Sequence, residues 1–157
     1  MPQVDVARLL LIAAVAFNGI LTGASLDQSI KQLPARRRMG VIAFSGYSRA
    51  ADLGNGIVWY AIIGVGAALF TIGAAVSAYL QGAPAAVAIP LYLAALTSLL
   101  HSFTTTQAAP TLFRVRQVKD DAAQLTVIFD RFERWQTLRA ALQLATFGLT
   151  LWALAAS

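Results

Sequence analysis

The stretch "FDRFERWQTLRAALQLATFGLTLWAL", residues 129–154, changes from charged to almost wholly apolar, and no Gly or Pro separates the two halves. We therefore expect one helix that is amphipathic at first and enters hydrocarbon later. A helix needs roughly 20 apolar residues to cross a bilayer. Four stretches approach or exceed that length, near residues 4–26, 53–80, 83–105 and 138–156. The sequence predicts an all-α, integral membrane four-helix bundle with an amphipathic cytoplasmic helix leading into the fourth span.

The composition agrees with this fold class. Of 157 residues, 58% are hydrophobic and only 12% are charged, which is more apolar than a soluble domain requires. The first stretch also has the small residues of a signal-peptide cleavage site at 22–24, but it is long for such a signal, so we interpret it as a span. We expect a single transmembrane domain over residues 1–157. The absence of cysteine excludes disulfides, thiolate metal sites and cysteine nucleophiles.

The basic residues predict the orientation. All Lys and Arg residues except Arg8 lie in the predicted connections 27–52 and 106–137 or at the start of the fourth span. With four spans these connections share one side, and the positive-inside rule makes that side cytoplasmic. We expect a multi-pass protein of the bacterial inner (plasma) membrane, with both termini and the 81–84 turn outside the cytoplasm. Orientation and anionic headgroups explain the net charge of +5, so we expect membrane lipid and no nucleic acid as partner.

Each span carries polar side chains at helical spacings of three and four, which places them on one face. Polar groups in hydrocarbon are costly unless they face the bundle interior or water, so the stripes predict a shared polar axis. At about 1.5 Å of rise per residue, Asn18 and His101 would lie roughly 12 and 6 Å from the cytoplasmic ends of their helices. The alternative is that these groups bond their own backbone or join helices. The stripes are Asn18, Thr22, Ser25 and Ser29; Ser48, Asp52, Asn55 and Trp59; Thr97, His101, Thr104 and Thr105; Arg139, Gln143, Thr146 and Thr150.

Projected on a helix, the opening stretch separates into two faces. Leu125, Ile128, Phe132 and Trp135 lie on one face, and Asp130, Glu133 and Arg134 lie on the other. We interpret the charged face as solvated, with Asp130 and Arg134 at ion-pair spacing. Arg139 interrupts the apolar face one turn beyond Trp135 and must therefore leave the helix toward the bundle. We expect Asp52 to be its counter-ion, with Asp27 as the alternative.

The chain resembles a family of small four-helix membrane proteins, mostly of unknown function, that includes the fungal anthrone oxygenases. The resemblance rests on the four-span layout and on "FNGILTGASLDQ", "YSRAADLGNG", "HSFTTTQAAP" and "FERWQTLRAAL". It implies oxidation of a polycyclic phenolic substrate without an obvious metal or flavin. It would make His101 and Asp52 candidate bases, and Arg139 or Asn18 stabilisers of an anionic substrate.

Two functions follow from these residues. The first is a polar pocket in the cytoplasmic half that binds or transforms a lipophilic, partly polar small molecule, as a binding protein or a cofactor-independent, oxygenase-like enzyme. The alternative is a structural or accessory subunit, in a homo-oligomer or a larger membrane complex, with buried ion pairs and basic loops that dock a partner. A lone His without Cys is a poor metal or haem site, so we expect no metal and no cofactor. The candidate catalytic residues are His101 and Asp52, and the candidate substrate-binding residues are Asn18, Tyr47, Asn55, Trp59, Trp135 and Arg139.

Overall fold

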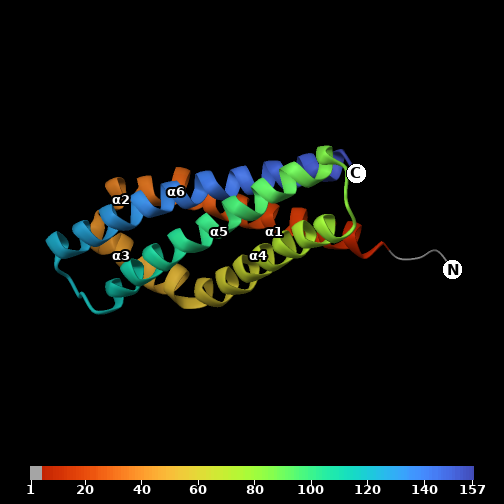
Figure 1. Cartoon of the computed structure of the whole chain (residues 1–157). Helices are drawn as coiled ribbons and strands as arrows, with labels where there is room; N and C mark the ends of the chain where they lie inside the picture. Colours follow the sequence, from red (N-terminus) through yellow and green to blue (C-terminus); the bar gives the residue numbers. More distant parts are fainter. Residues whose placement is uncertain (1–4) are drawn as a thin grey trace.

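The computed structural model describes residues 5–157, and over these residues it contains helices and turns but no strand (Figure 1). Its four long helices are α1 (Val6–Asp27), α4 (Gly56–Leu80), α5 (Ala85–Phe113) and α6 (Ala122–Ala155). By length and composition each of them is able to cross a membrane. The predicted all-helical class is confirmed, and the arrangement is compatible with a bundle in a multi-pass membrane protein.

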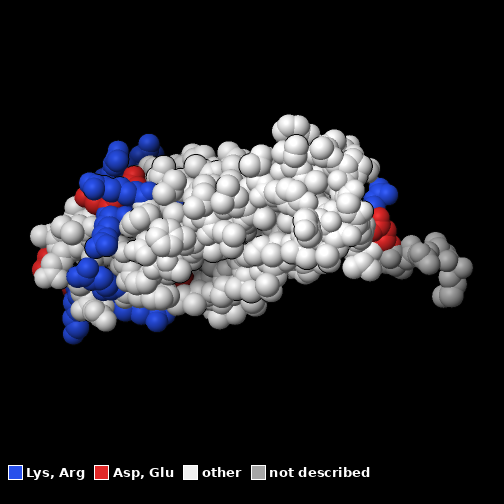
Figure 2. Space-filling model, viewed as in Figure 1, with Lys and Arg blue, Asp and Glu red and all other residues white. Residues whose placement is uncertain are grey.

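The two ends of the molecule differ in charge. The start of α1, the C-terminus and the 81–84 turn lie at one end, and the short helices α2 (Leu33–Met39) and α3 (Val41–Ala50) lie at the other (Figure 1). Lys and Arg gather at the α2–α3 end, whereas the middle of the visible face carries almost no charge (Figure 2). The two basic connections are therefore at the same end, as the charge pattern predicted.

The tight turn between α4 and α5 follows directly from the residues "QGAP". Gly82 adopts a positive φ of 61°, which costs little without a side chain. The Ala83 amide donates to the Ala78 carbonyl at 2.9 Å and the Gly82 amide donates to the Tyr79 carbonyl at 3.2 Å, the paired bonds of a Schellman cap. Pro84 then precedes the first turn of α5. This turn holds α4 and α5 close together at the end opposite α2 and α3.

The α6 helix confirms the reading of the opening stretch as one uninterrupted helix. It begins after Asp121, whose carboxylate accepts the Gln124 amide at 2.9 Å as an N-cap. Leu125, Ile128 and Phe132 are buried, as the predicted apolar face requires. The α5 helix differs from expectation because it passes the predicted end at residue 105 and continues to Phe113.

Two π-helical turns flank the α2–α3 segment. Gln28–Gln32 follows α1, and Ala51–Asn55 precedes α4, so α4 begins later than the predicted residue 53. The backbone leaves helical geometry at Gly54. A π turn contains an extra residue, so side chains beyond it point in different directions from those on an ideal α-helix. Both turns border the cavity described below.

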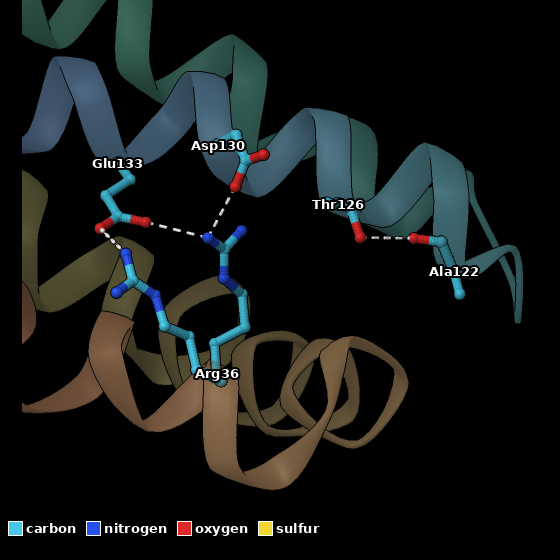
Figure 3. Close-up of polar contacts among 6 residues, drawn as sticks. Arg36, Ala122, Thr126, Asp130 and Glu133 are labelled. Carbon is cyan, nitrogen blue, oxygen red and sulfur yellow. Dashed lines mark hydrogen bonds and ion pairs between the residues drawn. The ribbon is translucent and has the colours of Figure 1, made fainter.

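Arg36 fastens α2 to α6 (Figure 3). Its Nη2 donates to Asp130 Oδ1 at 2.7 Å and to Glu133 Oε2 at 2.9 Å, and its guanidinium carbon lies 5.8 Å from the centre of the Phe129 ring. Arg37 Nη2 lies 3.8 Å from the second Glu133 oxygen. The prediction that Asp130 and Glu133 are only solvated is therefore wrong, because α2 folds back over them.

Two further arginines bind backbone carbonyls near the ends of α4 and α5. Arg49 Nε donates to the Val115 carbonyl at 3.2 Å, and Arg49 also donates to the Val118 carbonyl. Arg116 donates to the carbonyl of Leu53, inside the second π turn. Part of the basic excess therefore has an internal structural role in addition to any role in orientation.

Candidate functional site

A cavity of about 430 Å³ lies among α1, α4, α5 and α6, beside the two π-helical turns. This volume falls within the roughly 300–1,000 Å³ of small-molecule sites. Much of its wall is apolar and comes from α4, including Ile57, Ala61, Gly64, Val65, Ala68 and Leu69. Its polar lining is Ser25, Gln28, Asp52, Tyr60, His101, Ser102, Thr105 and Arg139. A few polar groups in an apolar chamber are typical of a binding site for a lipophilic molecule.

Asp52 joins the two π-helical turns at this cavity. Its Oδ1 accepts a hydrogen bond from Gln28 Nε2 at 3.2 Å, and its Oδ2 accepts one from Ser48 Oγ at 3.0 Å. The side chain is largely buried, and each carboxylate oxygen already has a protein donor. Asp52 therefore helps to fix the geometry of this wall, whatever else it does.

Arg139 reaches the same cavity from α6 without an acidic partner. Its Nη1 donates to Gln136 Oε1 at 2.8 Å, whereas its buried Nε has no hydrogen-bond partner among residues 5–157. Gln136, which is fully buried, is oriented in turn by a bond from its Nε2 to the Ser25 carbonyl at 3.3 Å. Gln136 thus connects Arg139 to α1.

The predicted pairing of Arg139 with Asp52 or Asp27 is wrong. Asp27 forms an ion pair with Lys31 and accepts a bond from Gln32 Nε2 at 2.6 Å. Asp52 is held by its neighbours in the π-helical turns and by Ser48, and no carboxylate of residues 5–157 lies within ion-pair distance of Arg139. Helical projection placed Arg139 on the bundle side but did not identify its neighbour.

His101 also lines the cavity, and its side chain is only 6% exposed. Its Nε2 is buried and has no partner among the described residues. The hydroxyls of Thr104 and Thr105 donate to the His101 carbonyl at 2.8 and 2.9 Å, so they bond their own helix as the alternative interpretation proposed. The imidazole therefore has an unused hydrogen-bonding position in the wall of the cavity.

Asn18, a predicted binding residue, lies outside the cavity lining and joins three helices. Its Nδ2 donates to Thr71 Oγ1 on α4 and to the Ala14 carbonyl, both at 2.8 Å, and its Oδ1 accepts from Gln143 Nε2 on α6 at 2.8 Å. Thr22 Oγ1 donates to the Gln143 carbonyl at 3.2 Å. The predicted stripes of α1 and α6 do face inward, where they bond to each other.

Four other predicted binding residues also lie outside the cavity lining. Tyr47 is 41% exposed and Trp59 is 50% exposed, and Asn55 is exposed as well. Trp135 packs against the apolar cluster that contains Leu125 and Phe129. Of the predicted site residues, the structure brings together Asp52, His101 and Arg139.

Tyr60, Gln28 and Gln136 were missed by sequence reasoning. Tyr60 lies near the start of an apolar helix, eight positions after Asp52 in the sequence. A tyrosine near the end of such a helix is usually interpreted as an anchor at the membrane interface. Gln28 lies one residue off the predicted stripe of α1, inside a π-helical turn. Gln136 does have a signal, because it precedes Gln143 by seven residues and so shares its face.

The resemblance to the family that includes the anthrone oxygenases stays a prediction, because comparisons of the chain with protein-family models, curated proteins and solved structures found no match.

Proposed function

We propose that this protein binds a lipophilic, partly polar small molecule in the cavity between α4 and α5. The observation that carries this proposal is that Arg139 Nε and His101 Nε2 are buried in one cavity wall and have no partner among residues 5–157. Buried polar groups are almost always hydrogen-bonded, so a bound molecule is the natural partner. The volume of this cavity is far larger than the about 30 Å³ that one water occupies in the liquid, so the cavity has room for a larger molecule.

The surroundings of the cavity support the entry of its ligand from the bilayer. Val65 and Leu69 line it and are also 58% and 64% exposed, so they form its rim on the outer surface of the bundle. In a membrane this surface faces lipid. A molecule dissolved in the lipid would therefore reach the cavity sideways, between α4 and α5, without crossing the polar end.

We further propose that the charged end faces the cytoplasm of a bacterial cell, which places both termini on the outer side of the inner membrane. The support is the location of the basic connections at one end, together with the positive-inside rule. If the protein also transforms its ligand, His101 is the group that would take a proton, because its Nε2 is free whereas both oxygens of Asp52 already accept hydrogen bonds.

Two glycines allow a matched test. A Cβ at Gly64 or at Gly23 would meet no atom within 4 Å, but Gly64 lines the cavity and Gly23 lies on an exposed face of α1. Gly64→Leu should fill the cavity, whereas Gly23→Leu should leave it open. We expect mass spectrometry of organic extracts from polymer-extracted native membrane discs to find one lipophile with the wild-type and Gly23→Leu proteins and to find it depleted with Gly64→Leu.

Equal recovery of every lipophile from all three proteins would contradict the proposal. The alternative role, a structural subunit, has a different signature. His101→Ala would then lose the fold or a co-purifying protein and leave the lipophile content per folded molecule unchanged.

A further inference from the structure

No acidic side chain of the protein neutralises the positive charge of Arg139. The sequence has seven Asp and Glu residues, all within the described part of the chain. Asp130 and Glu133 bind Arg36, and Asp27 binds Lys31. Asp5 and Asp121 cap α1 and α6, Asp52 accepts from two neutral donors, and Asp120 is exposed beside Asp121. Arg139 is therefore a buried cation with no anionic partner among residues 5–157.

The free edge of this guanidinium has a definite shape. Gln136 occupies Nη1, whereas Nε and Nη2 make no hydrogen bond within residues 5–157. The Nε–H and Nη2–H groups are parallel donors in one plane, the edge that matches the two oxygens of a carboxylate. A hydroxyl or a carbonyl would satisfy only one of the two donors. The cavity therefore favours a carboxylate over a neutral polar group.

The rest of the cavity determines the body of the ligand. Ala61, Gly64 and Ala68 present little side-chain volume on α4, and the space in front of Gly64 is empty to 4 Å. Asp52 also lines the cavity, but Gln28 and Ser48 hold its oxygens, so a ligand carboxylate has its attractive contact at Arg139. We propose, resting on the proposed function above, that the natural ligand is a lipophilic monocarboxylate. Its carboxylate lies on Nε and Nη2 of Arg139, and its hydrocarbon body lies along α4 and leaves between α4 and α5.

The test uses ligands that share one tail. Radiolabelled dodecanoate, dodecanol and dodecylamine are each bound to the full chain in zwitterionic phosphatidylcholine nanodiscs, and the signal of empty discs is subtracted. Because a hydrogen-bonded charge pair is stronger than a neutral contact, we expect dodecanoate to bind at least about tenfold more tightly than dodecanol. Dodecylamine should bind most weakly, since its ammonium repels Arg139. Acetate, added at the concentration at which dodecanoate saturates the protein, should not displace bound dodecanoate. Competition by 2-naphthoate shows whether the cavity also accepts a flat ligand body.

Two substitutions assign the preference to Arg139. Arg139→Gln should reduce dodecanoate binding about tenfold and leave dodecanol within about twofold. Arg139→Lys keeps the charge but not the planar edge, so it should retain the preference for the acid at lower affinity. Equal binding of dodecanoate and dodecanol by the wild type, an unchanged ratio in Arg139→Gln, or displacement by acetate would overturn the carboxylate ligand.

These outcomes are distinct from failure of the proposed function. If Gly64→Leu abolishes binding of dodecanol and Gly23→Leu does not, the cavity binds lipophiles even where the carboxylate preference fails. If no dodecyl compound binds the wild type above the empty discs, both proposals are overturned.

Discussion

The contact between α1 and α4 offers a sensitive test of the packing, because two nearby glycines on α4 have opposite surroundings. A Cβ on Gly66 would overlap the Phe17 ring at a separation that real Cβ atoms do not show. A Cβ on Gly64 would meet nothing within 4 Å. Gly66→Ala and Gly64→Ala therefore introduce the same methyl group into the same helix, but only the first forces a neighbour to move.

The matched pair cancels the effect of helix propensity. Each substitution gains up to about 1 kcal/mol from replacing Gly by Ala within a helix. Only Gly66→Ala also has the cost of overpacking, typically about 1–3 kcal/mol. The Phe17 ring also packs against that of Phe70 on α4, with the ring centres 5.0 Å apart, so moving it away from Gly66 would disturb this contact. We expect Gly66→Ala to have a free energy of unfolding about 1–3 kcal/mol below that of Gly64→Ala.

The assay is reversible unfolding in mixed micelles with increasing SDS, followed by far-UV circular dichroism. The Gly66→Ala transition should occur at lower SDS, and Phe17→Leu in the same chain should recover part of the difference. Coincident transitions for the two single variants would refute the described approach of α1 to α4.

Three further predictions use the same stability assay or simple labelling. Arg36→Gln should lower the free energy of unfolding by about 1–3 kcal/mol, because it removes two charge-assisted bonds from a buried arginine whose acidic partners are partly exposed. Arg37 is exposed, so Arg37→Gln should change the free energy of unfolding by less than about 0.5 kcal/mol. Equal losses in the two variants would contradict the role of Arg36 in holding α2 against α6. Asn18→Leu should cost about 1–3 kcal/mol because it leaves buried partners on α4 and α6 unsatisfied, and an unchanged SDS midpoint would argue against that network. The chain contains no cysteine, so a single introduced cysteine can report the orientation. Gln81→Cys, on the proposed outer side, should react with a membrane-impermeant maleimide in intact cells, whereas Arg38→Cys, on the proposed cytoplasmic side, should react only after lysis. The reverse result would invert the proposed orientation.

The sequence predicts the parts of this fold that depend on local patterns. The four apolar stretches, the turn at Gly82 and the continuity of α6 follow from composition, backbone chemistry and the absence of helix breakers. The inward direction of Arg139 follows from its place among apolar residues at helical spacing. These features need only neighbours within a few turns, which a single sequence contains.

The contacts of Arg36, Asp52 and Arg139 were not predictable in the same way. Arg36 meets Asp130 only because α2 folds back over α6, and the two residues are 94 positions apart. Gln28 and Asp52 lie inside the two π-helical turns and bond to each other across the α2–α3 segment, although they are 24 positions apart. Charge matching alone therefore favoured an Asp52–Arg139 pair. In the structure, Asp52 instead accepts a hydrogen bond from Gln28, and Arg139 donates one to Gln136.

The position of Arg139 has a consequence for how the protein is made. The span within α6 is the least apolar of the four, and Arg139 lies at its start, where an arginine adds less to the insertion free energy than the about 2.5–3.5 kcal/mol it adds at the centre of a span. Gln136 accepts a bond from Arg139 and is itself oriented by the Ser25 carbonyl of α1. The residue that supports the charge is therefore on α6 itself, but its orientation depends on α1, which is synthesised earlier. In a cell, the charged start of α6 would therefore gain its full support only after α1 is already in the bilayer.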